Sequence, residues 1–165
     1  MSRSHSFPDQ QFNTRNYHES DKGEFTENLV FVIMAFKIEN SDRVYGAIKD
    51  ECEKLKLNAT RSDDEIGSGV IIRDIAKKIE DAEFLICDLT GNRPNVYYEL
   101  GYAHGVGNEQ NDILLIAKEG TEIHFDIQPL RIQFYKSEED LKEKIRKNLN
   151  KMITETRGTD PNKSK

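Results

Sequence analysis

Short apolar runs alternate with segments of helical periodicity along the middle of the chain, and this alternation constrains the fold most. Leu29–Phe36 (LVFVIMAF) is a continuous apolar run, which is typical of a strand covered on both faces. Further strands are predicted over Leu57–Arg61, Glu83–Leu89, Asp112–Ala117 and Arg131–Tyr135. Strands that alternate with helices favour a parallel sheet with right-handed crossovers and helices on both faces. We therefore predict an α/β fold, a flavodoxin-like, doubly wound, mainly parallel five-stranded sheet with strand order 2-1-3-4-5.

Helical periodicity marks the segments that follow these strands. Ser41 is the predicted N-cap of the first helix, whose apolar positions are Val44, Ile48, Cys52 and Leu55. The second helix is marked by Ile71, Ile75 and Ile79, and the third covers Val96–Val106. The last begins with the capping-box pattern at Ser137 and has an apolar face of Leu141, Ile145, Leu149 and Met152. Residues 118–130 show no helical period, so a long loop is predicted there.

The composition separates a central domain from two polar ends. Residues 1–27 and 154–165 lack apolar periodicity, so we predict flexible tails on either side of a single domain over residues 28–153. The net charge is -6, and Lys and Arg are mixed with acids rather than gathered in a basic stripe, which argues against direct DNA or RNA binding. The chain shows neither an apolar run of the ~18 residues that a membrane span needs nor a signal-peptide pattern. We therefore expect a cytoplasmic protein with no membrane partner, in which Cys52 and Cys87 are buried, reduced thiols.

Two carboxylates occupy positions where the pattern predicts apolar surroundings. Asp88 directly follows the apolar run of the third strand, and Glu99 lies on the helical face of Val96, Leu100 and Ala103. Burial of a carboxylate without a partner is costly, so hydrogen bonds or a pocket should accompany Glu99. Ligands of such sheets bind beyond the carboxyl ends of the strands. We therefore expect both carboxylates at one crevice, with their pKa values pushed apart.

Each carboxylate also has a purely structural interpretation. Asp88 could bind the backbone amides of its own loop, as aspartates before Thr-Gly often do. Glu99 would be a partly exposed surface residue if the helix is rotated relative to the pattern. Asn95, which follows the stiff Pro94, is the predicted N-cap of this helix. That start places Glu99 in the first turns, near the carboxyl ends of the strands.

The stretch DLTGNRPNVYYELGYAHG, preceded in the chain by FVIMAF and TRSDDE, resembles the nucleoside 2-deoxyribosyltransferase superfamily. Within it the chain is most similar to the bacterial TIR-like, predicted nucleotide-binding branch. The similarity covers about Leu29 to Tyr135, and PNVYYELG is its most specific part. The resemblance places Glu99 on the family's catalytic glutamate and Asp88 on the acid that closes the third strand.

The resemblance also implies a set of substrate-binding residues. Arg61 and Asp63 match the loop after the second strand, and Met34 and Phe36 match the loop after the first. This chain departs from the family pattern at Ala35, where the family has proline, and at Arg93, which is inserted beside the family's Asn-Pro-Asn run. By the same resemblance, the loop amides could hold a phosphate, with Tyr98 as a candidate to pack on the base; the loop residues concerned are Gly91, Asn92, Arg93 and Asn95.

The family implies cleavage of an N-glycosidic bond in a nucleoside, a nucleotide or NAD. Glu99 would attack the anomeric carbon, and Asp88 would assist departure of the base or orient the sugar hydroxyls. We expect no cofactor and no metal, since the four histidines are scattered. Gly67 and Gly69 lack the Lys-Ser/Thr of a phosphate-binding P-loop and are interpreted as hinges.

Other classes of function remain open at this point. The same pocket could bind a nucleotide signal and switch an assembly, as TIR-like modules in bacterial antiphage defence do, or the chain could be an interaction adaptor. The unpartnered acid on a core face favours the enzyme. We also expect a homo-oligomer, although the sequence does not define its size, the substrate, or the choice between hydrolysis and transfer.

Overall fold

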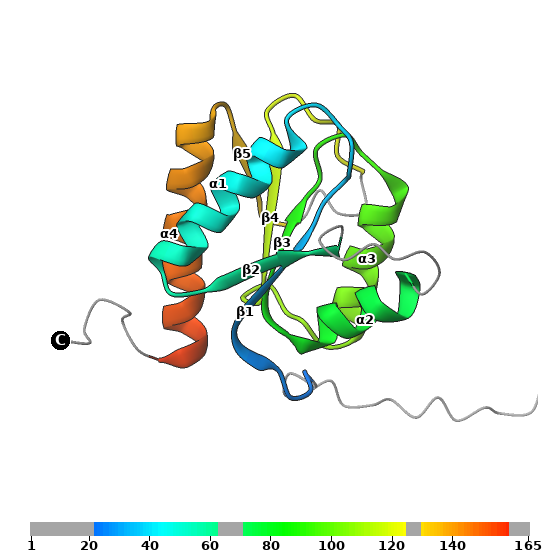
Figure 1. Cartoon of the computed structure of the whole chain (residues 1–165), viewed down its shortest axis with the longest axis vertical. Coiled ribbons are helices and arrows are strands. Elements are labelled where there is room, and N and C mark those ends of the chain that lie inside the picture. The colour runs from blue at the N-terminus through cyan, green and yellow to red at the C-terminus, as the bar shows by residue number, and fades with distance from the viewer. Residues whose placement is uncertain (1–21, 63–70, 125–129, 159–165) are drawn as a thin grey trace, which may run out of the picture.

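A computed structural model describes residues 22–62, 71–124 and 130–158 of the chain. The described residues form one sheet between two pairs of helices, with α1 and α4 on one face and α2 and α3 on the other (Figure 1). The strand order is β2-β1-β3-β4-β5, and every neighbouring pair is parallel. The predicted parallel sheet and its order are therefore confirmed.

The elements follow the predicted order, with small differences at their ends. The strands are β1 (Thr26–Ile33), β2 (Asn58–Arg61), β3 (Ala82–Asp88), β4 (Ile113–Lys118) and β5 (Ile132–Tyr135). The helices are α1 (Ser41–Lys54), α2 (Ile71–Asp81), α3 (Pro94–Gly105) and α4 (Glu138–Arg157). No helix occurs in the described parts of the β4–β5 connection, as predicted. The glycines predicted as hinges, Gly67 and Gly69, lie outside the described residues.

Side chains of the sheet alternate between two separate cores. Val30, Val32 and Ile86 pack with α1 and α4, whereas Phe31 and Cys87 pack with α2 and α3. Because successive strand residues point to opposite faces, the end of β3 is divided as well. Asp88 continues the row of Ile86 on the α1/α4 face, while Cys87 belongs to the α2/α3 face.

Two predicted helix caps are wrong, and one is confirmed. Ser41 is the first helical residue of α1, and the N-cap is Asn40, which has a φ of 65° and makes no capping bond through its side chain. In α3 the N-cap position is Arg93 and Pro94 begins the helix, because the fixed φ of proline suits the first helical position. Asn95 therefore lies inside the helix. Ser137 caps α4 as predicted, and its hydroxyl accepts from the Asp140 N–H at 3.2 Å.

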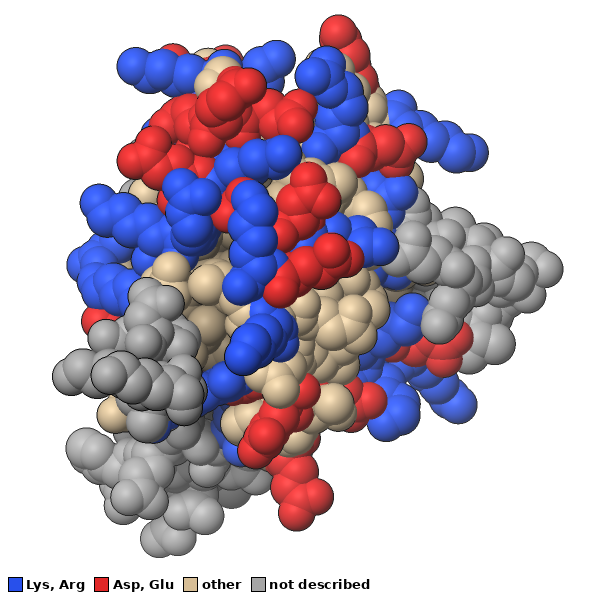
Figure 2. Space-filling model, turned by 60° about the vertical axis from the view of Figure 1, so that its left-hand side comes forward, with Lys and Arg blue, Asp and Glu red and all other residues tan. Residues whose placement is uncertain are grey.

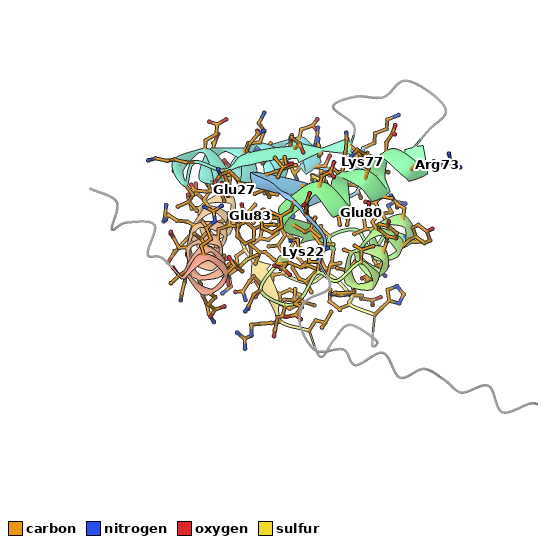
Figure 3. All side chains as sticks on the ribbon, turned by 90° about the horizontal axis from the view of Figure 1, so that it is seen from below. Lys22, Glu27, Arg73, Lys77, Glu80 and Glu83 are labelled. Atoms are coloured by element: carbon orange, nitrogen blue, oxygen red, sulfur yellow. The ribbon has the colours of Figure 1, made fainter. Side chains whose placement is uncertain are left out.

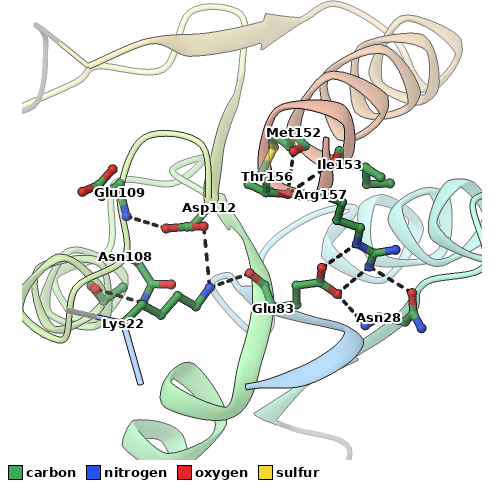
Figure 4. A network of polar contacts seen from close by, with 11 residues as sticks. Lys22, Asn28, Glu83, Asn108, Glu109, Asp112, Met152, Ile153, Thr156 and Arg157 are labelled. Carbon is green, nitrogen blue, oxygen red and sulfur yellow. Dashed lines mark hydrogen bonds and ion pairs between the residues drawn. The ribbon is translucent and has the colours of Figure 1, made fainter. Parts of the chain in front are cut away.

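A charged network lies at the end of the sheet where β1, β3 and β4 begin; its members Lys22 and Glu83 are labelled in Figure 3. The Glu83 side chain, only 6% exposed, accepts two hydrogen bonds from the Arg157 guanidinium, at 2.5 and 2.7 Å (Figure 4). The Asn28 N–H also donates to this carboxylate, at 2.6 Å. On the other side, the Lys22 ammonium donates to the Glu83 carbonyl at 2.6 Å and lies 3.7 Å from the Asp112 carboxylate. The network thus ties the starts of β1, β3 and β4 to the end of α4.

The contacts of Lys22 refine the expectation for the N-terminal tail. The described β1 begins at Thr26, inside the segment predicted as tail, and Lys22 is nearly buried. Deletion of residues 1–21 should change the melting temperature by less than about 2 °C, since that segment has no apolar periodicity. Deletion of residues 1–27 removes the Lys22 contacts and the first strand residues, and should lower it by about 4–10 °C. Scanning calorimetry of both truncations measures the difference, and equal melting temperatures would contradict the anchoring role.

Charges of both signs are mixed over the side of the molecule that carries α1 and α4 (Figure 2). Ion pairs cross between the two helices there: Arg43 lies 3.1 Å from Glu138, and Lys142 lies 3.3 Å from Asp50. Such exposed pairs contribute little to stability individually. Among the described helices, none is both long and apolar enough to span a membrane.

Candidate functional site

Glu99 lies in a cavity between α2 and α3. Its position on α3 follows from the helical period, because Val96, Leu100 and Ala103 are buried against the sheet and Glu99 is beside them. The cavity has a volume of about 340 Å³ and mostly apolar walls. We call it the Glu99 cavity; its lining residues are Phe36, Ile75, Ala76, Ile79, Asn95, Tyr98, Glu99 and Tyr102. Three substrate-binding residues inferred from the family resemblance, Phe36, Asn95 and Tyr98, therefore share a cavity with Glu99.

The surroundings of Glu99 favour its neutral form. Burial among apolar side chains raises the pKa of its carboxyl from 4.5 to about 7. Within the described residues, no group donates a hydrogen bond to this carboxyl and no cation pairs with it. The acid is therefore present in both charge states near neutral pH, and a raised pKa of this kind is common at functional sites.

The raised pKa of Glu99 makes folding stability depend on pH. In the pH interval between 4.5 and about 7 the unfolded chain ionises at this position while the folded protein keeps the proton, so stability falls as the pH rises. The loss is complete above the folded pKa and absent below the unfolded one. Glu99→Gln cannot ionise and should be more stable than the unaltered protein near pH 8, by about 1–3 kcal/mol after allowance for partial exposure. Near pH 4 the two should be equally stable. Urea unfolding at both pH values tests this, and a gain of equal size at both would contradict the assignment.

Asp88 lies in a second cavity, on the other face of the sheet. Its side chain is almost fully buried at the end of β3, and the Thr90 N–H donates to Oδ1 at 3.0 Å. Burial raises the pKa of this carboxyl, and the hydrogen bonds from Thr90 oppose that effect. The cavity has a volume of about 180 Å³ and lies where α1 and α4 begin. We call it the Asp88 cavity; its polar lining includes Arg43, Thr90, Lys118, Tyr135, Lys136 and Glu138.

The expectation of one shared crevice for Asp88 and Glu99 is wrong. The alternation of β3 directs Asp88 toward α1 and α4, whereas α3 carries Glu99 on the opposite face. The loops after β1 and β3 lie close together, since a Cβ on Gly91, whose φ is 83°, would lie 3.2 Å from the Ile38 side chain. Both carboxyls nonetheless lie near Cys87. Burial raises the pKa of the Cys87 thiol most, and the nearby charges of Asp88 and Glu99 raise it further. The two acids flank the same strand end without sharing a cavity.

Two residues predicted to bind substrate have described contacts within the protein. Met34 is buried in the core on the α1/α4 face. The Arg61 guanidinium stacks on the Tyr45 ring at 4.2 Å and pairs with Asp42 at 2.7 Å. Neither residue lines the Glu99 cavity or the Asp88 cavity. The described contacts of Arg61 are those of a residue that joins β2 to α1.

The remaining described residues predicted to bind substrate lie at or just before the start of α3. Asn92 has a φ of 50°, and its side-chain oxygen is buried without a hydrogen-bond partner in the described part of the chain. Arg93 is exposed at the N-cap position, and Asn95 lines the Glu99 cavity from the first turn of α3. Asp63 lies outside the described residues.

Sequence reasoning missed several residues of both cavities. Tyr102 and the α2 residues Ile75 and Ile79 form walls of the Glu99 cavity, although the two isoleucines were identified as the inner face of α2. Because Tyr102 follows Glu99 by three residues, helical spacing alone indicates that they are neighbours. Lys118 and Tyr135 end β4 and β5, so strand-end position was the available signal for them.

Solved structures match this fold, although no protein-family model and no curated protein matches the sequence. A CMP N-glycosidase from Clostridium botulinum matches with a TM-score of 0.59 and 18% identity, over 73% of this chain and 99% of that one. A 2-deoxyribosyltransferase from Bacillus psychrosaccharolyticus matches with a TM-score of 0.55 and 13% identity, over 69% of this chain and 90% of that one. A flavoprotein from Thermotoga maritima matches with a TM-score of 0.60 and 17% identity, over 79% of this chain and 38% of that one. The fold is flavodoxin-like.

Likeness at these identities concerns the fold alone. The matched proteins carry different names, a glycosidase, a transferase and a flavoprotein, and one fold can support many activities. The function must therefore be argued from the site.

Proposed function

We propose that this protein cleaves the N-glycosidic bond of a nucleoside, a nucleotide or NAD, as a hydrolase or a glycosyl transferase, with Glu99 as the nucleophile. The observation that carries the proposal is the Glu99 carboxyl, half-buried in an apolar cavity without a hydrogen-bond or ion-pair partner among the described residues. A carboxylate in such a place costs stability, which is expected of catalytic groups. The fold likeness to a CMP N-glycosidase and a 2-deoxyribosyltransferase supports the same reaction class.

The Glu99 cavity suits a nucleobase and its sugar. Its volume of about 340 Å³ lies in the usual range of small-molecule sites, and its walls are apolar and aromatic. Tyr98 is 68% exposed at this cavity, so one ring face is available to stack on a base. Asn95 supplies an amide in the same cavity, which could donate and accept hydrogen bonds at the base edge.

The proposed reaction has two displacement steps at the anomeric carbon. The ionised Glu99 oxygen attacks this carbon as the bond to the base nitrogen breaks, and the base leaves with the bonding electron pair and takes a proton from solvent. The resulting glycosyl ester is then opened by water in a hydrolase or by a second base in a transferase. Because the attacking group must be ionised, base release should increase with pH up to about 7. Asp88 has no part in these steps, since it lines the other cavity.

A chromatographic screen for released base tests the proposal directly. Nucleosides, nucleoside monophosphates and NAD are each incubated with the protein, with and without a second free base as acceptor. Base released without acceptor identifies hydrolysis, and a new nucleoside formed with it identifies transfer. A protein that binds one of these compounds without releasing base would instead support the TIR-like signal-binding module. If no compound is bound and no base is released in any arm, both functions are excluded for these compounds.

A further inference from the structure

The Asp88 cavity is a polar site that the proposed reaction does not use. It shares no described lining residue with the Glu99 cavity. Its walls come from the carboxyl ends of β3, β4 and β5 and from the first turns of α1 and α4. In open parallel sheets this end is where ligands bind. The question is which ligand its groups would recognise.

Asp88 supplies an acceptor that the fold itself does not require. Asp88 is only 3% exposed and lines the cavity. It interacts with no cation in the described part of the chain. Its described hydrogen-bond partner is Thr90 in its own loop, which uses one of the two carboxyl oxygens at 3.0 Å. A buried carboxyl costs free energy unless other groups satisfy it. Ligand hydroxyls are donors of the right kind, because carboxylates commonly bind the hydroxyls of a ribose.

Hydroxyl groups continue the polar wall beside Asp88. The Thr90 hydroxyl accepts the Lys118 N–H at 2.9 Å and lies 3.4 Å from the Tyr135 hydroxyl. Burial, and then the nearby Asp88, raise the pKa of Tyr135 to about 12, so its hydroxyl stays protonated and can donate. The Asp88 carboxyl, an acceptor, and the Tyr135 hydroxyl, a donor, thus line the same cavity. A ligand hydroxyl can donate to the first and accept from the second.

The rim of the same cavity carries positive charge. The Lys118 side chain forms no ion pair with any described residue. Lys136, which follows β5, also lines the cavity and is close enough to Asp140 to help lower the pKa of that carboxyl. Arg43 forms an ion pair with Glu138, so these two residues together add no net charge to the rim. Glu39 is a further acid at the rim. The start of α1, at Asn40 and Ser41, lines this space, so the positive end of the helix dipole faces it. The Asn40 side chain makes no capping bond there. An anionic group on the ligand would be stabilised here.

We infer that the Asp88 cavity binds a small sugar phosphate of about pentose size, with Asp88 and Tyr135 on the sugar hydroxyls and Lys118 and Lys136 on the phosphate. The cavity, with a volume of about 180 Å³, is of a size for a small ligand of this kind. The inference does not rest on the proposed function, because Glu99 and its cavity take no part in it.

Calorimetric titration with ribose 5-phosphate, ribose and inorganic phosphate tests the inference on the full chain. Ribose 5-phosphate should bind more tightly than either part alone. Asp88→Asn and Tyr135→Phe should each weaken ribose 5-phosphate by about tenfold and leave inorganic phosphate unchanged, because each removes contacts to hydroxyls. The exposed pair Lys118→Met with Lys136→Met should weaken both phosphates by at least about tenfold. The lysine pair keeps the measurement decisive if Asp88→Asn fails to fold.

Matched controls separate this site from the proposed reaction. Lys151→Met removes an exposed lysine from α4 that lines neither cavity, and Glu99→Gln alters only the other cavity. Both should bind ribose 5-phosphate as the unaltered protein does. No binding to the unaltered protein, inorganic phosphate as tight as ribose 5-phosphate, or a loss caused by Glu99→Gln would each overturn the inference. Failure of the base-release screen would leave it standing.

Discussion

Glu99→Gln should abolish base release on any substrate that the screen identifies, by at least about 10³-fold in kcat/KM. The amide has the size of the carboxyl, so it fills the same space between α2 and α3. It cannot form the glycosyl ester, and it removes a charge from an apolar cavity. The fold should therefore persist while the reaction stops. Single-turnover measurements of released base, together with circular dichroism, compare the variant with the unaltered protein.

Two further variants locate the effect at the Glu99 carboxyl. Glu99→Asp keeps the charge but withdraws it by one methylene group, so activity should be reduced and not abolished. Glu139→Gln makes the same chemical change at an exposed position of α4 and should leave the rate unchanged. A slow substrate, such as a 2-fluoro-substituted nucleoside, should leave a sugar adduct on the Glu99 peptide in mass spectrometry. Normal turnover by Glu99→Gln, or an adduct elsewhere, would refute the assignment of the nucleophile.

Arg157→Met should be the most destabilising single change outside the cores, with a loss of about 3–5 kcal/mol in the free energy of unfolding. Arg157 donates two hydrogen bonds to the Glu83 carboxylate, whose side chain is only 6% exposed. Methionine keeps the apolar stem but leaves the Asn28 N–H as the one described hydrogen-bond donor to this buried carboxylate, with the Lys22 ammonium nearby. Urea unfolding of the variant gives the loss.

The double substitution Glu83→Gln with Arg157→Met provides the decisive comparison. It removes the charge along with its partner, so it should recover part of the stability lost in Arg157→Met. Lys151→Met, an exposed change on the same helix, should stay within about 0.5 kcal/mol of the unaltered protein. If Arg157→Met and Lys151→Met had the same free energy of unfolding, the network would not contribute to the stability of the fold.

The sheet was predictable because its information is local and repeated. Each strand is a short apolar run, each helix has its own period, and alternation of the two dictates parallel pairing. Helix starts were less predictable where two signals compete. Asn95 has the side chain of an N-cap, but Pro94 prefers the first helical position, and the proline determined the start of α3. At α4 only Ser137 offered a cap, and there the prediction holds.

For the candidate site, the sequence predicts only on which face of its own helix or strand a side chain lies. The helical period placed Glu99 on the inner side of α3, where the structure has it. The period of β3 also indicates that Asp88 faces away from Cys87, so a shared strand end does not place Asp88 and Glu99 on the same face of the sheet. Arg61 could not be placed in this way, since its stacking on Tyr45 and its pairing with Asp42 depend on how β2 and α1 pack.

The position of α4 has a consequence for how this protein is made. One face of the sheet is covered by α2 and α3, which are synthesised early, but the opposite face needs Leu141, Ile145 and Leu149 from the last described helix. On the ribosome, β1, β3 and β4 therefore emerge with this apolar face covered by α1 alone until α4 follows. Arg157, which fastens the start of β3, comes later still. Nascent chains of this protein should consequently depend on chaperones that shield exposed apolar strands, and truncation before α4 should yield aggregates rather than a smaller domain.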